Sequence, residues 1–278
     1  MKKIRYTTQM LKQTAQLSLL AFLLSSCSST TNGGRSQLLM VSTAQMSQNS
    51  AAAYSQLRTE AANKKALYPE TAPITKRVNA ITQRLIAQVG VFRPDAAKWP
   101  WSVSVIRDDQ VNAMCLPDGR IVVFDAIINQ LSLTDDELAA ILGHEIAHAL
   151  REHSREKVSQ DTLQGLTLSI GGALAGLNGS TVQQLGQLGQ LGISLPFSRA
   201  METESDIMGL ELMARAGYNP QSAPNVWKKM TALNGASTSS LLSTHPSNSE
   251  RITNLTANIP RVMPLYQAAL ASNPPKKK

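Results

Sequence analysis

The chain has 278 residues, of which 42% are hydrophobic and only 4% aromatic, and its formal net charge is +8. This length accommodates a substantial hydrophobic core in one or two domains. The basic residues form no basic helix and do not alternate with aromatic residues along a strand, so the composition argues against a nucleic-acid partner.

The first 27 residues have the features of a bacterial lipoprotein signal peptide. A basic segment without acidic residues reaches Lys12, and the short apolar stretch 17–24 follows, too short to span a membrane. Leu24-Ser25-Ser26-Cys27 resembles a lipobox, whose cysteine is lipidated, and Ser28 in place of Asp points to the outer membrane. We expect a signal peptide over 1–26 and a lipid anchor on Cys27. The alternative is an ordinary secretory signal with an incidental cysteine.

The segment that follows the anchor is rich in Ser, Thr, Gln and Gly. It predicts a flexible tether over residues 27–48, joined to a folded domain over residues 49–262. That domain opens with an Ala-rich helix over 49–66. A second helix is predicted from Pro73 to Val89, because Pro suits the first helical position and apolar residues recur at helical spacing.

Three short segments with turn signals between them predict a small β-sheet: Trp101–Ile106, Val111–Leu116 and Ile121–Phe124. A short helix, Ala126–Leu131, follows. An edge strand beside a catalytic site can pair with an extended peptide, which makes Asn112 and Ala113 candidate substrate-binding residues. A structural hairpin is the alternative, and the residues alone leave the two equal. Cys115 is expected to be a buried apolar residue and not a ligand or nucleophile.

The central motif lies in a helix predicted over Thr134–Glu152. His144 and His148 are four residues apart, so they share one face and both imidazoles can reach one metal ion. Glu145 flanks that face, where its carboxylate can take a proton from water. This His-Glu-x-x-His spacing is typical of zinc hydrolases, and two solvated helix histidines are the alternative. His153 lies off the metal face and is not expected to be a ligand.

A zinc site with three protein ligands needs one more donor, which a helix over Arg199–Arg215 can supply. Glu202 and Asp206 share a face of this helix, so Glu202 can complete the site and Asp206 can accept the free ring N–H of a ligating histidine. Glu204 points away from that face. Before this helix, the Gly/Leu/Gln-rich segment 163–195 predicts a lid or a helical hairpin. A helix is expected over Glu250–Asn258, and a basic disordered tail is expected over 263–278.

These motifs together resemble the HtpX-like and CAAX-prenyl-protease-like zinc metallopeptidases over about residues 70–260. The resemblance rests on the His-Glu-x-x-His helix, on Arg199-x-x-Glu202-x-x-x-Asp206, and on Asn112-Ala113-x-x-x-Pro117-x-Gly119. The lipobox makes the chain most similar to the bacterial outer-membrane-associated lipoprotein branch, the BepA and LoiP type. It implies an α+β, mainly α, gluzincin-like zincin fold, in which a helical bundle surrounds the zinc helix and a small β-sheet carries an edge strand.

The same resemblance implies Zn²⁺ on His144, His148 and Glu202, with Glu145 as the general base. The implied activity is cleavage of extended or misfolded polypeptides at the periplasmic face of the outer membrane, in protein quality control, with an envelope assembly machine or protease as partner. The alternative is a lipoprotein chaperone or assembly factor whose metal site is idle or structural. His245, in a His-Pro pair, is hypothesised to face the zinc, either as a donor to the oxyanion or as an inhibitory fourth ligand. The alternative is a turn histidine without a role.

Overall fold

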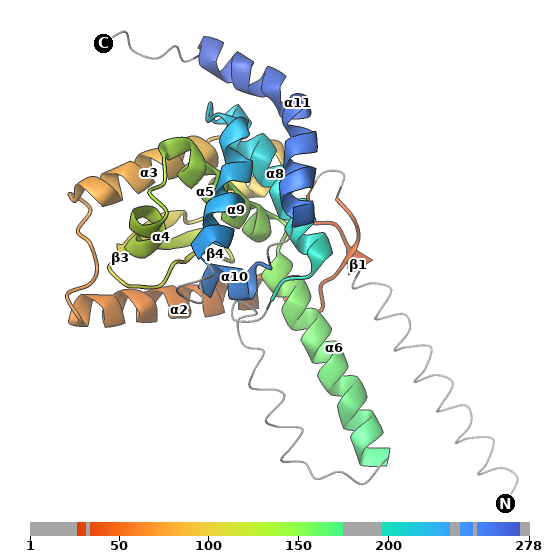
Figure 1. Ribbon diagram of the computed structural model, residues 1–278. Helices are drawn as coiled ribbons and strands as arrows, with labels where there is room; N and C mark the ends of the chain where they lie inside the picture. The colour runs from red at the N-terminus through yellow and green to blue at the C-terminus, as the bar shows by residue number, and fades with distance from the viewer. Residues whose placement is uncertain (1–26, 32–33, 175–195, 234–239, 247–248, 273–278) are drawn as a thin grey trace, which may run out of the picture.

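The computed structural model describes residues 27–31, 34–174, 196–233, 240–246 and 249–272 (Figure 1). The predicted signal peptide and the second part of the predicted lid, residues 175–195, lie outside these ranges, as does the end of the tail, residues 273–278. None of the described helices is both long and apolar enough to cross a membrane.

Helices make up most of the described chain, as expected. The longer ones are α2 (Thr43–Asn63), α3 (Pro73–Ile86), α5 (Asp135–Leu150), α6 (His153–Leu174), α8 (Arg199–Arg215), α9 (Ala223–Leu233) and α11 (Ser249–Ser272). The short ones are α4 (Asp125–Gln130), α10 (Ser240–Thr244) and the 3-10 turns η1 (Val89–Val91), η2 (Pro94–Lys98) and η3 (Pro220–Ser222). Figure 1 shows α5 in the interior, with α3, α8 and α9 around it, whereas α6 projects away from the body.

Helix α5 begins where the sequence predicts that it should. The Thr134 hydroxyl accepts from the Glu137 N–H, and the Glu137 carboxylate accepts from the Thr134 N–H, which completes a capping box. Every residue from Ile141 to Leu150 is buried. A helix buried on all sides belongs to a core, so the two histidines and the glutamate of its motif are held in a rigid environment.

The main sheet is mixed and has three strands, β3 (Ser102–Ile106), β4 (Ala113–Leu116) and β5 (Arg120–Phe124). Strand β5 lies in the middle, parallel to β3 and antiparallel to β4, so β4 is an edge strand. One face of the sheet packs on α2, and the other joins the core around α5. The thiol of Cys115 is free, and the residue is buried as predicted.

The predicted flexible tether is wrong over most of its length. Two short strands, β1 (Cys27–Ser28) and β2 (Gln37–Leu38), pair antiparallel, and β2 packs against α6. Arg35 makes a two-pronged ion pair with Glu156, and the Gln37 side chain donates to the Arg151 carbonyl. Buried acidic groups need cationic partners, and this segment supplies one. Helix α2 accordingly begins at Thr43, six residues earlier than predicted.

Residues 163–174 continue α6, which agrees with the helical-hairpin alternative for the first part of the segment 163–195. The expectation of a disordered tail is corrected. Helix α11 runs to Ser272, so the predicted tail is helical up to that residue, although Pro260 and Pro264 lie inside it. Proline in a helix interior costs about 3 kcal/mol. Here Val262 is buried, and Leu265 and Tyr266 pack against the core, which offsets that cost.

Candidate metal centre

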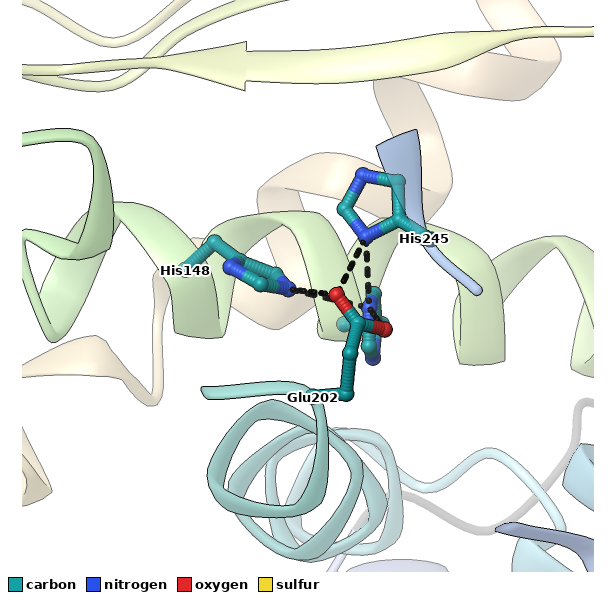
Figure 2. A group of neighbouring side chains, drawn as sticks. His148, Glu202 and His245 are labelled. Atoms are coloured by element: carbon teal, nitrogen blue, oxygen red, sulfur yellow. Dashed lines mark hydrogen bonds and ion pairs between the residues drawn. The ribbon is translucent and has the colours of Figure 1, made fainter. Parts of the chain in front are cut away.

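Four side chains from three separate parts of the chain converge at one point. His144 and His148 come from α5, Glu202 from the first turn of α8, and His245 from the residue after α10. One donor atom from each lies within 4.8 Å of the donor atoms of the other three, and all four residues are buried. Figure 2 shows His148, Glu202 and His245 pointing toward one another.

The spacing of these donors fits a zinc ion. Nε2 of His144 lies 3.1 Å from Nε2 of His148 and 3.3 Å from Nδ1 of His245. The Glu202 carboxylate lies 3.4 Å from Nε2 of each α5 histidine and 3.0 Å from Nδ1 of His245. A tetrahedral zinc ion with bonds of about 2.0–2.1 Å would hold its donors about 3.3–3.4 Å apart. The donor types, nitrogen and carboxylate oxygen, are those that zinc takes in proteins.

The electrostatics of the cluster favour a cation at its centre. Burial raises the pKa of Glu202, but hydrogen bonds with His144, His148 and His245 outweigh burial and hold that pKa well below its usual range. Burial lowers the pKa of His144, yet hydrogen bonds to Asp206 and Glu202 prevail and raise it to about 9. Burial holds the pKa of His148 well below its ordinary value, so this ring is neutral, the form that binds a metal.

Asp206 lies behind His144, as its position on α8 predicted. Its Oδ1 is 3.0 Å from Nδ1 of His144, a distance at which it accepts the ring N–H and leaves Nε2 free to bind a metal. Glu204, which lies between Glu202 and Asp206 in the sequence of α8, does not reach the four-donor cluster. It instead accepts a hydrogen bond from His153, which also lies outside the cluster, as predicted.

Arg251 is the residue that the sequence reasoning missed. Its guanidinium donates to both oxygens of Asp206, at 2.8 and 2.7 Å, and its Nη1 lies 2.6 Å from Oε2 of Glu202. It also stacks 3.6 Å above the Trp227 ring. One signal was available, because Arg251 sits in the first turn of α11, where the helix dipole disfavours a cation. A basic residue at that position predicts an acidic partner elsewhere in the fold.

Glu145 flanks the cluster and faces the same space. Its Oε1 is buried, accepts no hydrogen bond from the described residues, and lies 3.5 Å from Nε2 of His245. Burial is the largest influence on its carboxyl and raises the pKa, although the neighbouring His245 and His144 partly offset this. A carboxylate that is poorly solvated and close to a metal site is suited to accept a proton.

A groove of about 510 Å³ opens above the cluster. Strand β4 borders one side and α2 the other, and Glu145, His148 and His245 line the groove between them. Asn112 and Ala113, the candidate substrate-binding residues, are part of its lining. The free edge of β4 therefore lies beside the candidate metal site.

Comparison with known proteins places the chain in a family. The model of Peptidase family M48 matches residues 74–259. The chain is 37% identical over 188 residues to "Mitochondrial metalloendopeptidase OMA1" of Schizosaccharomyces pombe, covering 67% of this chain and 53% of the relative.

Two bacterial proteins are also similar. "Beta-barrel assembly-enhancing protease" of Yersinia pestis is 29% identical over 56% of this chain and 32% of its own length. "Metalloprotease LoiP" of Escherichia coli is 28% identical over 55% of this chain and 60% of its own length. The match thus spans between about a third and three fifths of the length of these relatives, and identity to the fission-yeast mitochondrial protein exceeds identity to the two bacterial ones. The family model covers well over half of the chain, which therefore belongs to peptidase family M48.

Proposed function

We propose that this chain is a zinc-dependent endopeptidase that hydrolyses peptide bonds in extended or misfolded polypeptide segments. The observation that carries the proposal is the position of Glu145. Its buried carboxylate lies beside a cluster of donors that fits zinc, in a groove flanked by the free edge of β4. An edge strand can hold an extended backbone by main-chain hydrogen bonds without selecting one sequence.

The residues divide the chemistry among themselves. His144, His148 and Glu202 would hold the zinc, which when bound polarises the peptide carbonyl and makes water more acidic. Glu145 takes the proton from the attacking water and then delivers it to the nitrogen of the leaving amine. Asp206 keeps the proton of His144 on Nδ1, and Asn112 and Ala113 hold the substrate backbone.

His245 takes part in this proposal as a reversible fourth ligand. Its Nδ1 lies among the other donor atoms, 3.3 Å from Nε2 of His144, so it would occupy the place that a catalytic zinc site leaves open to water. The arrangement in Figure 2 is then a closed form, and His245 must move away before hydrolysis begins. It follows the short helix α10 and belongs to neither of the two helices that supply the other donors, so it can move without shifting them.

The decisive experiment is Glu145→Gln, assayed with an unfolded, fluorescently labelled protein as substrate. The variant should bind one zinc ion as the parent does but lose about 10²–10⁴-fold in cleavage rate, because the amide cannot accept the proton. Glu211→Gln, a charge change at a half-buried position of α8 outside the cluster, is the matched control and should cleave like the parent. Undiminished cleavage by Glu145→Gln would refute the proposed role.

We further propose that the protein is lipidated on Cys27 and acts at the periplasmic face of the bacterial outer membrane, in envelope quality control. The lipobox-like sequence and the similarity to the Yersinia and Escherichia proteins support this placement. Cys27→Ser should abolish incorporation of radiolabelled palmitate and release the protein from the membrane fraction. A membrane-bound Cys27→Ser variant would contradict the lipid anchor.

A second function is favoured by one feature of the site. Four protein donors around one point are typical of structural zinc sites, which keep no open position. The protein would then be a lipoprotein chaperone or outer-membrane assembly factor. The same Glu145→Gln variant separates the two functions. If the cell needs proteolysis by this protein, the variant fails to replace the parent, and if the cell needs only its binding to other proteins, the variant replaces it.

A further inference from the structure

His148, the second histidine of the motif in α5, has a hydrogen-bond partner on the side of its ring that faces away from the cluster. Nδ1 of His148 lies 3.0 Å from Nδ1 of His153, and Nε2 of His153 lies 3.0 Å from Oε2 of Glu204. His153 is fully buried, and its ring also contacts Phe197. Neither His153 nor Glu204 belongs to the four-donor cluster.

The direction of these hydrogen bonds follows from simple constraints. A histidine that binds zinc through Nε2 carries its proton on Nδ1, so Nδ1 of His148 must donate. Nδ1 of His153 therefore accepts, and the proton of this second ring is on Nε2. That N–H points at Glu204, whose carboxylate can only accept. The two rings and the carboxylate therefore each have one protonation state. In that state Nε2 of His148 carries no proton, and its lone pair faces the four-donor cluster.

Glu204 is itself fixed by two arginines. Arg151, which is 2% exposed, donates to Oε2 of Glu204 through Nε and Nη2, at 3.3 and 3.1 Å. Arg35, from the segment that precedes α2, donates to Oε1 at 2.7 Å. These bonds hold the carboxylate in its ionised form and in one orientation. The residues that follow Cys27 therefore contribute to the same arrangement.

We propose that His153 and Glu204 are positioning residues that fix the tautomer and orientation of His148 for metal binding. This inference rests on the proposed function, because it takes His148 as a zinc ligand. His144 receives the equivalent support directly from Asp206, at 3.0 Å, whereas His148 receives it from Glu204 through a second imidazole. Partners of this kind raise the basicity of a ligating histidine and stabilise the ring in its metal-binding orientation.

The test is the zinc dissociation constant of the purified protein, measured by competition with a chromophoric chelator. His153→Leu removes the acceptor and should raise the constant about 10–100-fold. His153→Asn places a carbonyl oxygen at the position of Nδ1, so it should recover most of the lost affinity. A role in filling space alone predicts no such rescue, because Leu keeps more of the buried volume of His153 than the smaller Asn does.

Two more variants examine the carboxylate. Glu204→Gln should weaken zinc binding, whereas Glu211→Gln on the same helix, which loses a half-buried pair with Arg215, should not. In ¹⁵N NMR spectra of the four histidines, His148 of the zinc-loaded parent should show a protonated Nδ1 hydrogen-bonded to nitrogen, a signature that His153→Leu abolishes.

The outcomes separate this inference from the proposed function. A parent that binds no stoichiometric zinc overturns both. A parent that binds zinc, with His153→Leu binding within twofold of it or with Asn no better than Leu, overturns only the roles of His153 and Glu204. If His153→Leu does not fold, the comparison of Glu204→Gln with Glu211→Gln decides, because equal affinities would refute the proposal.

Discussion

Gly143 of α5 and Gly209 of α8 lie in backbone contact where the two metal-site helices meet. A Cβ on Gly143 would lie 2.9 Å from the carbonyl oxygen of Gly209, and a Cβ on Gly209 would lie 2.8 Å from the backbone nitrogen of His144. Any side chain larger than hydrogen would push the helices apart. The close approach allows the short side chain of Asp206 to reach His144 and allows Glu202 to reach both histidines.

Substitution of these glycines should therefore disturb the metal site. In Gly209→Ala the new methyl group meets backbone atoms that cannot rotate away, an overpacking cost of about 1–3 kcal/mol. The gain in helix propensity, about 1 kcal/mol, offsets only part of it. We expect a lower melting temperature without metal and weaker zinc binding. Gly90→Ala is the control, because its nearest neighbour would be 3.8 Å away. Equal zinc affinity in Gly209→Ala and Gly90→Ala would contradict the idea.

Removal of Arg251 should be strongly destabilising. The residue is 5% exposed and pairs with both Asp206 and Glu202, so Arg251→Leu leaves two buried carboxylates without that partner. Loss of one partner of a buried pair costs about 3–5 kcal/mol. The matched control is Arg215→Leu, which breaks a more exposed pair with Glu211 and should cost less than about 1 kcal/mol. Urea unfolding of the metal-free proteins measures both, and similar costs would show that the buried pairs contribute nothing.

His245→Ala distinguishes between the roles considered for this histidine. If His245 closes the site as a fourth ligand, its removal should raise the rate of peptide hydrolysis and weaken zinc binding, because one donor is lost and the open position becomes permanent. If it donates to the oxyanion, the rate should fall while zinc affinity holds. If both the activity and the zinc affinity equal those of the parent, His245 has neither role.

Cys115 should be unreactive in the folded protein. Burial raises the pKa of its thiol well above the ordinary value, and the Glu145 carboxylate adds to the effect. Each unit of increase lowers the thiolate fraction at pH 8 about tenfold, and the thiolate is the form that reacts. In a chain carrying Cys27→Ser, iodoacetamide should modify the native protein far more slowly than the same protein in urea. Equal rates in the two conditions would show that the thiol is accessible.

The sequence by itself determined the local parts of this protein. The capping box at Thr134, the shared faces of His144 with His148 and of Glu202 with Asp206, and the bounds of α8 all follow from helical periodicity and end signals. These features depend on residues three or four positions apart, which interact in any helix whatever surrounds it. The strands around Cys115 were likewise predicted to within two residues at each end.

Only the tertiary structure decided which distant groups meet. The pairing of Arg251 with Asp206, the contact of His153 with Glu204, and the packing of Arg35 on Glu204 join residues 45, 51 and 169 positions apart. No periodicity encodes such pairs, because they arise when buried charges and polar rings must find partners inside a common core. The extension of α11 past Pro260 has the same origin, since contacts of Val262 with the core outweigh a local preference for a break.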